Sequence, residues 1–576
     1  MATPKRNERS WSSAPARSAV AQNGIGGLAR NLGGMPADVM FRVGRAYGMT
    51  ADRGVYQAVA VSGGRIAAAE RSRDDLDSLI GPGTAVIDDP ELVLYPAFGD
   101  THNHQLLAAR DLDYVALDQA HSIDELVQAL RDAATRTPAG EWIISSRCWH
   151  ETHLREGRLP TARELDAASA DHPIFVQRGG HVAVANSAAL RLAGITATSA
   201  DPPSGTVVRL ADGTPAGVLI EAGALDPVRR LLPPVTEDQQ AGLLARQCQL
   251  YNRSGIGVVR DPGLVPEEVP VYQAVADRGE LTTRTRLMFW VLPQATVADT
   301  LAYVDSLPPP GSVPDYGGGL RIWGLKMGMD GGVEGGFLCQ PYANNPSFRG
   351  HAFWEPDDFE QVVEHAVGRG WRIGCHAVGD CAVRRVLDAY EGVAARHPGL
   401  PPGTLVIEHA FLADAQTRAR AVRLGVGITV QHPLLYSLGG NLVRYWGEDR
   451  TSQVMPVRAW VDEGALIAAG SDCNVSFFDP LLSIWGLVTR GTRTVGVQGP
   501  ESRVDTYTAI WLYTAAGGRL LREDGRVGTL APGAFADIVG FRGDLMDDPV
   551  DDLPSRQPAL TVVGGRAVHD PDALFG

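Results

Sequence analysis

Residues 92–104 read LVLYPAFGDTHNH, an apolar run that ends in two histidines separated by one residue. Seven similar apolar runs follow, and most of them precede an amphipathic stretch typical of a helix. These runs are IGVVRDPG (256–263), TRLMFWVL (285–292), RIWGLKM (321–327), WRIGCHA (371–377), TLVIEHA (404–410), VGITVQH (426–432) and ALIAAGSD (465–472). Eight strand–helix units predict an α/β fold, the closed (β/α)8 TIM barrel, whose catalytic groups lie at the carboxyl ends of the strands.

The pattern differs at both ends of the chain. Residues 38–92 and 505–576 contain short alternating runs broken by Gly and Asp, which are typical of antiparallel strands. We therefore predict that both ends form one small composite β-sandwich domain, with the barrel at 93–504. About 150 residues separate the first two barrel runs, too many for a simple connection, so an inserted subdomain is expected at about 111–250, over the barrel mouth.

Composition excludes several classes of partner. The formal net charge of −15, without a long Lys/Arg run, argues against nucleic acid and anionic membranes. The sequence has no run of 18 consecutive apolar residues, so we expect no membrane-spanning helix. Residues 1–37 resemble a flexible leader rather than a signal peptide. The 6 cysteines are scattered without a C-x-x-C pair. They predict no disulfide framework, so we expect a reducing, cytoplasmic compartment.

His102 and His104 lie two residues apart, so on an extended segment their side chains point to the same side. Two such imidazoles can hold a divalent metal, although a surface or packed histidine pair looks the same in sequence. His376, His409 and Asp472 stand at the ends of three other predicted strands. Because these ends meet at one face of a barrel, the five residues predict a site for zinc or another divalent transition ion.

Lys326 stands in an apolar strand, where a free ammonium is unfavourable to bury. One interpretation is a salt bridge to Asp330, or a side chain that reaches solvent. The other is a carbamylated lysine, whose two oxygens can bridge two metals. Sequence does not show a modification, so one or two metals per chain both remain open.

The motifs and their order resemble the amidohydrolase superfamily, and within it the branch that contains the N-substituted formamide deformylases. YPAFGDTHNH resembles the strand-one motif PGF-x-D-x-H-x-H, and WGLKMGMDGG resembles the lysine–aspartate–glycine segment. IGCHAVGDCAV, VIEHAFL and AAGSDCNV resemble the motifs of the fifth, sixth and eighth strands, and RGGHVAVANSAAL matches within the insertion. The resemblance runs from about Val39 to His569. Ala97 and Gly99 depart from the pattern and affect packing rather than ligands.

The resemblance implies a metal-dependent hydrolase that cleaves a non-peptide carbon–nitrogen bond, in an amide or N-substituted formamide, with metal-activated water. The implied metal ligands are His102, His104, His376, His409, Asp472 and, as the bridging carbamate, Lys326. The implied catalytic residues are Asp472 as general base, His409, and His181, which would bind the substrate carbonyl. A small amide-like substrate and a homodimer also follow from the resemblance.

Other interpretations stay open at this point. A metal site does not fix the reaction, so deamination, cyclic-amide opening and decarboxylation are alternatives. A non-catalytic binding protein is less favoured, because every ligand-type position is filled. Asp100 is either a support for the imidazoles or a turn residue. Glu221 and Asp380 are candidates for caps, and Cys375 and Cys473 for small packing residues.

Overall fold

The computed structural model describes residues 35–202 and 205–575, so the predicted leader lies outside the described residues except for 35–37. Eight parallel strands form the central sheet, in the order β17-β16-β15-β14-β13-β12-β11-β5. They are β5 (Phe98–Asp100), β11 (Ile256–Leu264), β12 (Arg284–Trp290), β13 (Leu320–Gly328), β14 (Ile373–Ala377), β15 (Leu405–His409), β16 (Gly427–Val430) and β17 (Leu466–Ala469). Thr101 N–H donates to the carbonyl of Ala469 at 3.2 Å, so the edges of the sheet meet. Each strand overlaps one predicted run, which confirms the TIM barrel.

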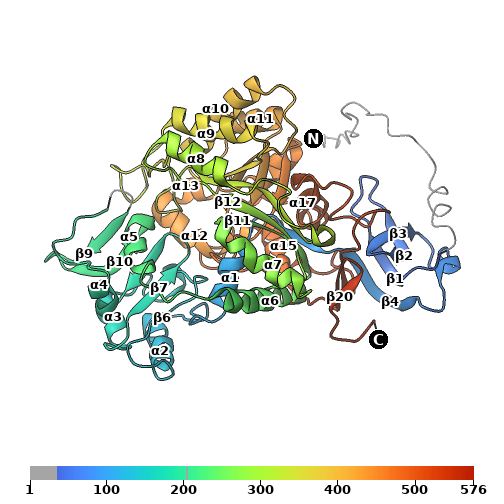
Figure 1. The fold of residues 1–576 in the computed structure, drawn as a ribbon, viewed down its shortest axis with the longest axis horizontal. Helices are drawn as coiled ribbons and strands as arrows, with labels where there is room; N and C mark the ends of the chain where they lie inside the picture. The colour runs from blue at the N-terminus through green and yellow to red at the C-terminus, as the bar shows by residue number, and fades with distance from the viewer. Residues whose placement is uncertain (1–34, 203–204, 576) are drawn as a thin grey trace, which may run out of the picture.

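Helices cover the outside of the barrel (Figure 1). They are α1 (Gln105–Asp111), α6 (Glu237–Arg253), α7 (Val269–Asp277), α8 (Val297–Ser306), α9 (Pro356–Gly368), α10 (Asp380–Arg396), α11 (Ala415–Leu424), α12 (His432–Trp446), α13 (Glu448–Thr451), α14 (Val457–Asp462), α15 (Pro480–Thr489), α16 (Thr506–Leu512) and α17 (Ala515–Leu520). Several begin at a side-chain cap; Thr236 and Gln239, for example, form a reciprocal capping box at α6. No helix in the described ranges is long and apolar enough to cross a bilayer.

Strands from both chain ends form a second sheet, in the order β20-β19-β18-β4-β1-β2-β3. They are β1 (Val39–Tyr47), β2 (Val55–Ser62), β3 (Arg65–Glu70), β4 (Ala85–Pro96), β18 (Ile538–Arg542), β19 (Leu560–Val563) and β20 (Arg566–His569). The antiparallel β4–β18 pair joins the two ends. Edge strand β3 also contacts the segment before β18, where Ile66 N–H donates to Ala534 O at 2.9 Å. This composite β domain, drawn at the right of Figure 1, confirms the predicted contribution of both chain ends.

Two boundaries differ from the sequence expectation. The run at 92–104 divides at Ala97, because its first part continues β4 in the β domain and only Phe98–Asp100 enter the barrel. Residues 506–520, predicted to lie in the β domain, instead form α16 and α17, whose apolar side chains belong to the barrel core. The last barrel strand needs a helix on its outer face, and α17 packs against β17.

The insertion after β5 contains its own sheet, in the order β6-β7-β8-β10-β9. Its elements are α2 (Ile123–Ala134), β6 (Ile143–Ile144), α3 (Ala162–Asp166), β7 (Ile174–Arg178), β8 (Val182–Ala185), α4 (Ser187–Leu192), β9 (Thr206–Arg209), β10 (Pro215–Ile220) and α5 (Glu221–Arg229). Helix α6, at the end of the predicted insertion, packs with α1 and α7 in the barrel core. The inserted sheet therefore ends before α6.

Cys339 and Cys381 form a disulfide, which the sequence analysis did not predict. Cys339 lies in the long loop after β13, and Cys381 lies in the first turn of α10. The pairing is non-local, with a separation of 42 residues. The adjacent Asp380 carboxylate accepts a hydrogen bond from Cys339 N–H at 2.9 Å, which agrees with a structural role for Asp380.

Candidate active site

The predicted site residues gather at the carboxyl ends of the barrel strands. His102 and His104 follow β5, His376 lies in β14, His409 ends β15, and Asp472 follows β17. Nε2 of His104 lies 3.2 Å from Oδ1 of Asp472, and Nε2 of His102 lies 3.4 Å from the same oxygen. The ring of His409 is centred 4.7 Å from that of His102 and 4.6 Å from that of His376. The structure thus brings together five side chains that are up to 370 positions apart in sequence.

A second contact fixes how each of three rings is oriented. Nδ1 of His102 lies 2.7 Å from Oε2 of Glu408, and Nδ1 of His409 lies 2.7 Å from Oε1 of Gln431. His376 directs its Nε2 to a backbone carbonyl at 3.1 Å. The other nitrogen of each ring is left for the cluster, an arrangement typical of metal-binding histidines. Burial lowers the pKa of His409 to about 3, so this ring is neutral and its lone pair is available.

Glu408 was missed by the sequence analysis, although it immediately precedes His409 in an apolar strand. Its carboxylate is fully buried and accepts two hydrogen bonds from Arg260, at 2.8 and 2.7 Å. Burial opposes its ionisation, but the charge of Arg260 and the contact with His102 outweigh burial and hold the pKa of Glu408 well below its ordinary value. The sequence feature that could have identified Glu408 is a charged residue inside an apolar run.

Asp100 supports the site in a different way from the one expected. It accepts hydrogen bonds from Ser471 N–H at 2.9 Å and from the Asn103 side chain at 2.8 Å. It therefore holds together the two loops that carry His102 and Asp472, whereas Glu408 contacts the imidazole of His102. The difference arises because Asp100 lies at the strand end, while Glu408 comes from β15, which does not pair with β5.

Lys326 is buried, at 2% exposed, and its Nζ lies 3.4 Å from Nε2 of His102. Burial lowers the pKa of its ammonium. The alternative salt bridge to Asp330 is not formed, because the Asp330 carboxylate accepts backbone N–H groups of Phe337, Val378 and Gly379 at 2.8–3.1 Å. Lys326 thus faces the histidine cluster.

Three residues at or beside this site have a strained backbone. His409 has φ 74° and Asp472 has φ 58°, in the left-handed region that residues with a β-carbon rarely adopt. Glu221, beside the cavity, has φ 62°. Strained backbone is common at functional sites, where the surrounding structure fixes a side chain in the position that its chemistry needs.

His181 lies beside the cluster, its ring centred 6.1 Å from that of His376. Its Nδ1 is 2.9 Å from Oε2 of Glu221. Burial opposes protonation of His181, but the negative charge of Glu221 outweighs it and raises the pKa. Glycines permit this arrangement, because a β-carbon on Gly332 would lie 2.9 Å from the His181 ring and one on Gly331 would lie 2.7 Å from Glu221.

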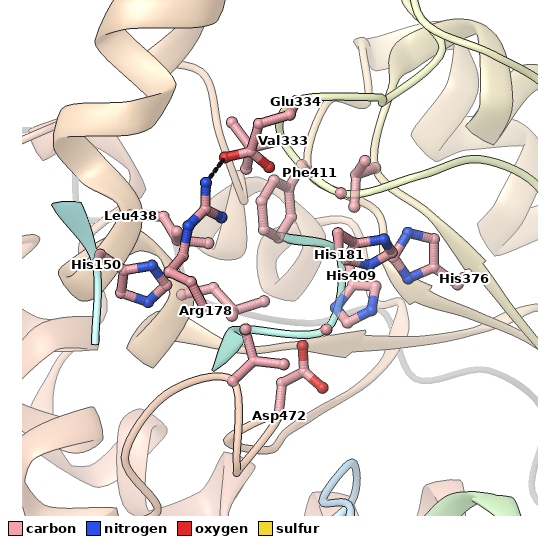
Figure 2. Close-up of a pocket in the computed structure, with 16 residues that line it drawn as sticks. His150, Arg178, His181, Val333, Glu334, His376, His409, Phe411, Leu438 and Asp472 are labelled. Carbon is pink, nitrogen blue, oxygen red and sulfur yellow. Dashed lines mark hydrogen bonds and ion pairs between the residues drawn. The ribbon is translucent and has the colours of Figure 1, made fainter. Parts of the chain in front are cut away.

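A small cavity opens over the cluster, and Asp472, His409, His376 and His181 line it (Figure 2). Its other polar lining residues, His150, Arg178 and Glu334, were not singled out in the sequence. The dashed contact in Figure 2 is the 2.7 Å ion pair between Arg178 and Glu334. These residues come from the insertion and from the loop after β13, so their proximity could not be read from strand ends.

A sequence model described as the amidohydrolase family matches residues 85–569. The chain belongs to the amidohydrolase family. It is 27% identical over 521 residues to an N-substituted formamide deformylase of Arthrobacter pascens, covering 88% of this chain and 94% of the relative. It is also 27% identical over 551 residues to the protein LONG AFTER FAR-RED 3 of Arabidopsis thaliana, covering 93% and 92%.

Among solved structures, an uncharacterized metal-dependent hydrolase of Pyrococcus horikoshii shares the fold, with a TM-score of 0.70 and 23% identity. The match covers 89% of this amidohydrolase and 99% of that chain. Family membership makes the protein a hydrolase. It acts on carbon–nitrogen bonds.

Proposed function

We propose that this amidohydrolase cleaves the carbon–nitrogen bond of a small amide or N-substituted formamide, with a divalent metal held at the strand ends. The convergence of four histidines and Asp472 beneath the cavity carries this proposal. The similarity to a protein named N-substituted formamide deformylase supports the class of bond.

The residues fit a divalent transition ion. One ligand atom each from His102, His104 and Asp472 lies within 4.8 Å of the other two. Neutral imidazole and carboxylate are ligands that zinc accepts, and His376 and His409 extend the set. When bound, such a metal acidifies water and polarises a carbonyl group.

Two side chains of this protein would then move or hold protons. The Asp472 carboxylate, positioned by His102 and His104, would accept the proton of the attacking water and deliver it to the departing amine. His181, oriented by Glu221, would donate a hydrogen bond to the carbonyl oxygen, where negative charge develops during attack. Apolar residues of the cavity wall would keep other water away from both.

Lys326 is proposed to carry a carbamate. Its burial beside His102 leaves the amine unpaired with any carboxylate within 4.0 Å in the described ranges. A carbamate would be anionic and would offer two oxygens, which suits two cations about 3.5–4 Å apart. The proposal therefore favours two metals per chain over one.

The proposed function is tested by metal analysis and a substrate panel. Purified protein should contain a divalent transition metal, lose activity on chelation and regain it with zinc. N-substituted formamides, linear amides, cyclic imides and amidines would then be compared. Hydrolysis of a formamide or linear amide supports the proposal, while full activity without metal, or turnover of cyclic imides or amidines alone, contradicts it.

A further inference from the structure

A chain of hydrogen-bonded side chains links two histidines of the candidate site. Nδ1 of His102 lies 2.7 Å from Oε2 of Glu408, and the hydroxyl of Thr429 lies 2.5 Å from the same oxygen. The side-chain nitrogen of Gln431 lies 2.9 Å from that hydroxyl, and its oxygen lies 2.7 Å from Nδ1 of His409. We call Glu408, Thr429 and Gln431 the relay, because they connect the two imidazoles.

The pairing of two barrel strands brings the relay together. Glu408 on β15 and Thr429 on β16 are register partners in a parallel pair. Gln431 comes two residues after Thr429, and side chains two apart on an extended segment point the same way. All three side chains are fully buried, so their polar groups depend on protein partners rather than on bulk water.

The direction of each hydrogen bond follows from what each group is able to donate. Glu408 is ion-paired with Arg260 at 2.7 Å, and a carboxylate accepts hydrogen bonds but donates none. The single hydroxyl proton of Thr429 therefore goes to Glu408, which leaves the Thr429 oxygen as an acceptor for the Gln431 amide N–H. The Gln431 oxygen then faces His409, so His409 must donate from Nδ1.

The other tautomer of His409 is incompatible with the relay. With its proton on Nε2, the ring would need a donor at Nδ1, and the Gln431 amide would have to turn over. The Gln431 oxygen would then face the Thr429 oxygen with no proton between them, because that hydroxyl is committed to Glu408. Burying two acceptors without a donor is unfavourable, so only the Nδ1–H form of His409 satisfies every group of the relay.

We propose that Thr429 and Gln431 are positioning residues that keep the proton of His409 on Nδ1 and leave its Nε2 unprotonated for a metal. Glu408 fixes the His102 tautomer directly and the His409 tautomer through the two other relay residues. One carboxylate thus sets the ligand nitrogen of two rings whose centres are 4.7 Å apart. The use of these nitrogens for a metal rests on the proposed function, whereas the tautomers themselves do not.

Three variants test the relay. Thr429→Val removes the hydroxyl but keeps the branched shape, and Thr429→Ser keeps the hydroxyl. Thr404→Val is the matched control, because Thr404 is a buried threonine just before β15 whose hydroxyl donates to the carbonyl of Pro401 at 2.7 Å, outside the relay. In Thr429→Val the Gln431 amide is free to take either orientation, so His409 is no longer held in one tautomer.

The tautomer is measured by nitrogen NMR of the metal-free protein with isotope-labelled histidine, in which the shifts of the two ring nitrogens show which one carries the proton. The signal of His409 is assigned by its absence in His409→Gln. Wild type, Thr429→Ser and Thr404→Val should show a protonated Nδ1, and Thr429→Val should gain the Nε2–H form.

Zinc affinity, measured by competition with a chelator, gives a second readout. Loss of a residue that orients a metal ligand weakens binding by about 10–100-fold, so Thr429→Val should lie in this range, with Thr429→Ser and Thr404→Val near wild type. If wild type binds no zinc, the proposed function fails, while the spectra still decide the tautomer. A protonated Nε2 of His409 in wild type, or an unchanged tautomer or zinc affinity in Thr429→Val, would overturn this inference.

Discussion

The two ends of the barrel use buried charged and polar residues in opposite ways. Near the amino end of β12, Arg284 and Arg286 are paired with Asp537 and Glu523, at 2.6 and 2.5 Å. Each pair is doubly hydrogen-bonded and almost fully buried. At the carboxyl end, the imidazoles and Asp472 face one another across a cavity, each with an atom left for a further partner.

The buried ion pairs at the amino end contribute to stability, whereas the residues at the carboxyl end are arranged for function. Arg284 lies in the barrel and Asp537 in the β domain, so their pair joins the two and is complete without a ligand. The proposed metal would complete the carboxyl-end cluster, whose backbone is strained at His409 and Asp472. Barrel enzymes generally carry their chemistry at this end and their stabilising contacts at the other.

The largest effect on turnover is expected for Asp472→Asn. The amide can fill the same space but cannot accept the proton of attacking water, so kcat should fall by about 10²–10⁴-fold. Steady-state kinetics and circular dichroism would show lost turnover in a folded protein. Asp479→Asn is the matched control, because Asp479 caps α15 and asparagine caps a helix equally well. Wild-type turnover in Asp472→Asn would remove Asp472 from the role of base.

Lys326→Ala should have the next largest effect. Without the bridging carbamate, at least one metal per chain should be lost, and kcat should fall by about 10²-fold, as for loss of other groups that support a metal. Elemental analysis alongside kinetics measures both quantities. Full metal content with a near-normal rate would show instead that Lys326 is a buried amine without a role at the metal site.

The barrel and most residues of the candidate site were predictable because both depend on local patterns. Each apolar run marked a strand, and a histidine or aspartate at its end marked a position on the catalytic face. His181 and Glu221 were found only through resemblance to a family. Both lie in the insertion, where His181 precedes β8 and Glu221 follows its partner strand β10, so their contact depends on a strand pairing that no local pattern specifies.

Most of the features that the sequence did not predict depend on contacts between distant segments. Glu408 lies on β15, which does not pair with β5, yet it contacts His102 just after β5. A sequence does not show which carboxylate will contact which imidazole. The Cys339–Cys381 pairing needs a long loop to return to α10. Residues 506–520 were misassigned because short helices after the last strand lack a long apolar period.

A smaller effect is expected for Glu221→Gln, which alters the carboxyl end of the barrel beside the histidine cluster. Glu221 raises the pKa of His181, so the protonated imidazole persists to higher pH and is lost as pH rises through that pKa. Removing the carboxylate should move the alkaline limb of kcat/KM to lower pH. Glu334 and Asp472 also face His181 and should keep part of the shift.

The pH profile of kcat/KM measures this displacement. Asp226→Asn, on the same helix but half-exposed, is the control and should leave the profile in place. An unchanged alkaline limb in Glu221→Gln, with kcat/KM otherwise retained, would show that protonation of His181 does not govern turnover.

The smallest effect on catalysis, and a large one on stability, is expected at the opposite end of the barrel in Asp537→Ala. Arg284 would keep its stacking on Phe535, 3.6 Å from the ring centre, and its bond to a backbone carbonyl, but its buried charge would lose the carboxylate. Breaking a buried pair costs about 3–5 kcal/mol of unfolding free energy. Urea denaturation should show this loss, while kcat of the folded protein stays at the wild-type value.

Combining Asp537→Ala with Arg284→Met distinguishes an unpaired charge from a lost contact. If the unpaired guanidinium causes the loss, the double variant should recover much of it, because no charge is then buried alone. If the double variant is as unstable as Asp537→Ala, the loss comes from the hydrogen bond that Asp537 accepts from Gly564 N–H at 2.8 Å. If kcat falls while stability does not, the amino end of the barrel controls the chemistry at the carboxyl end. That result would contradict the division between a stabilising end and a functional end.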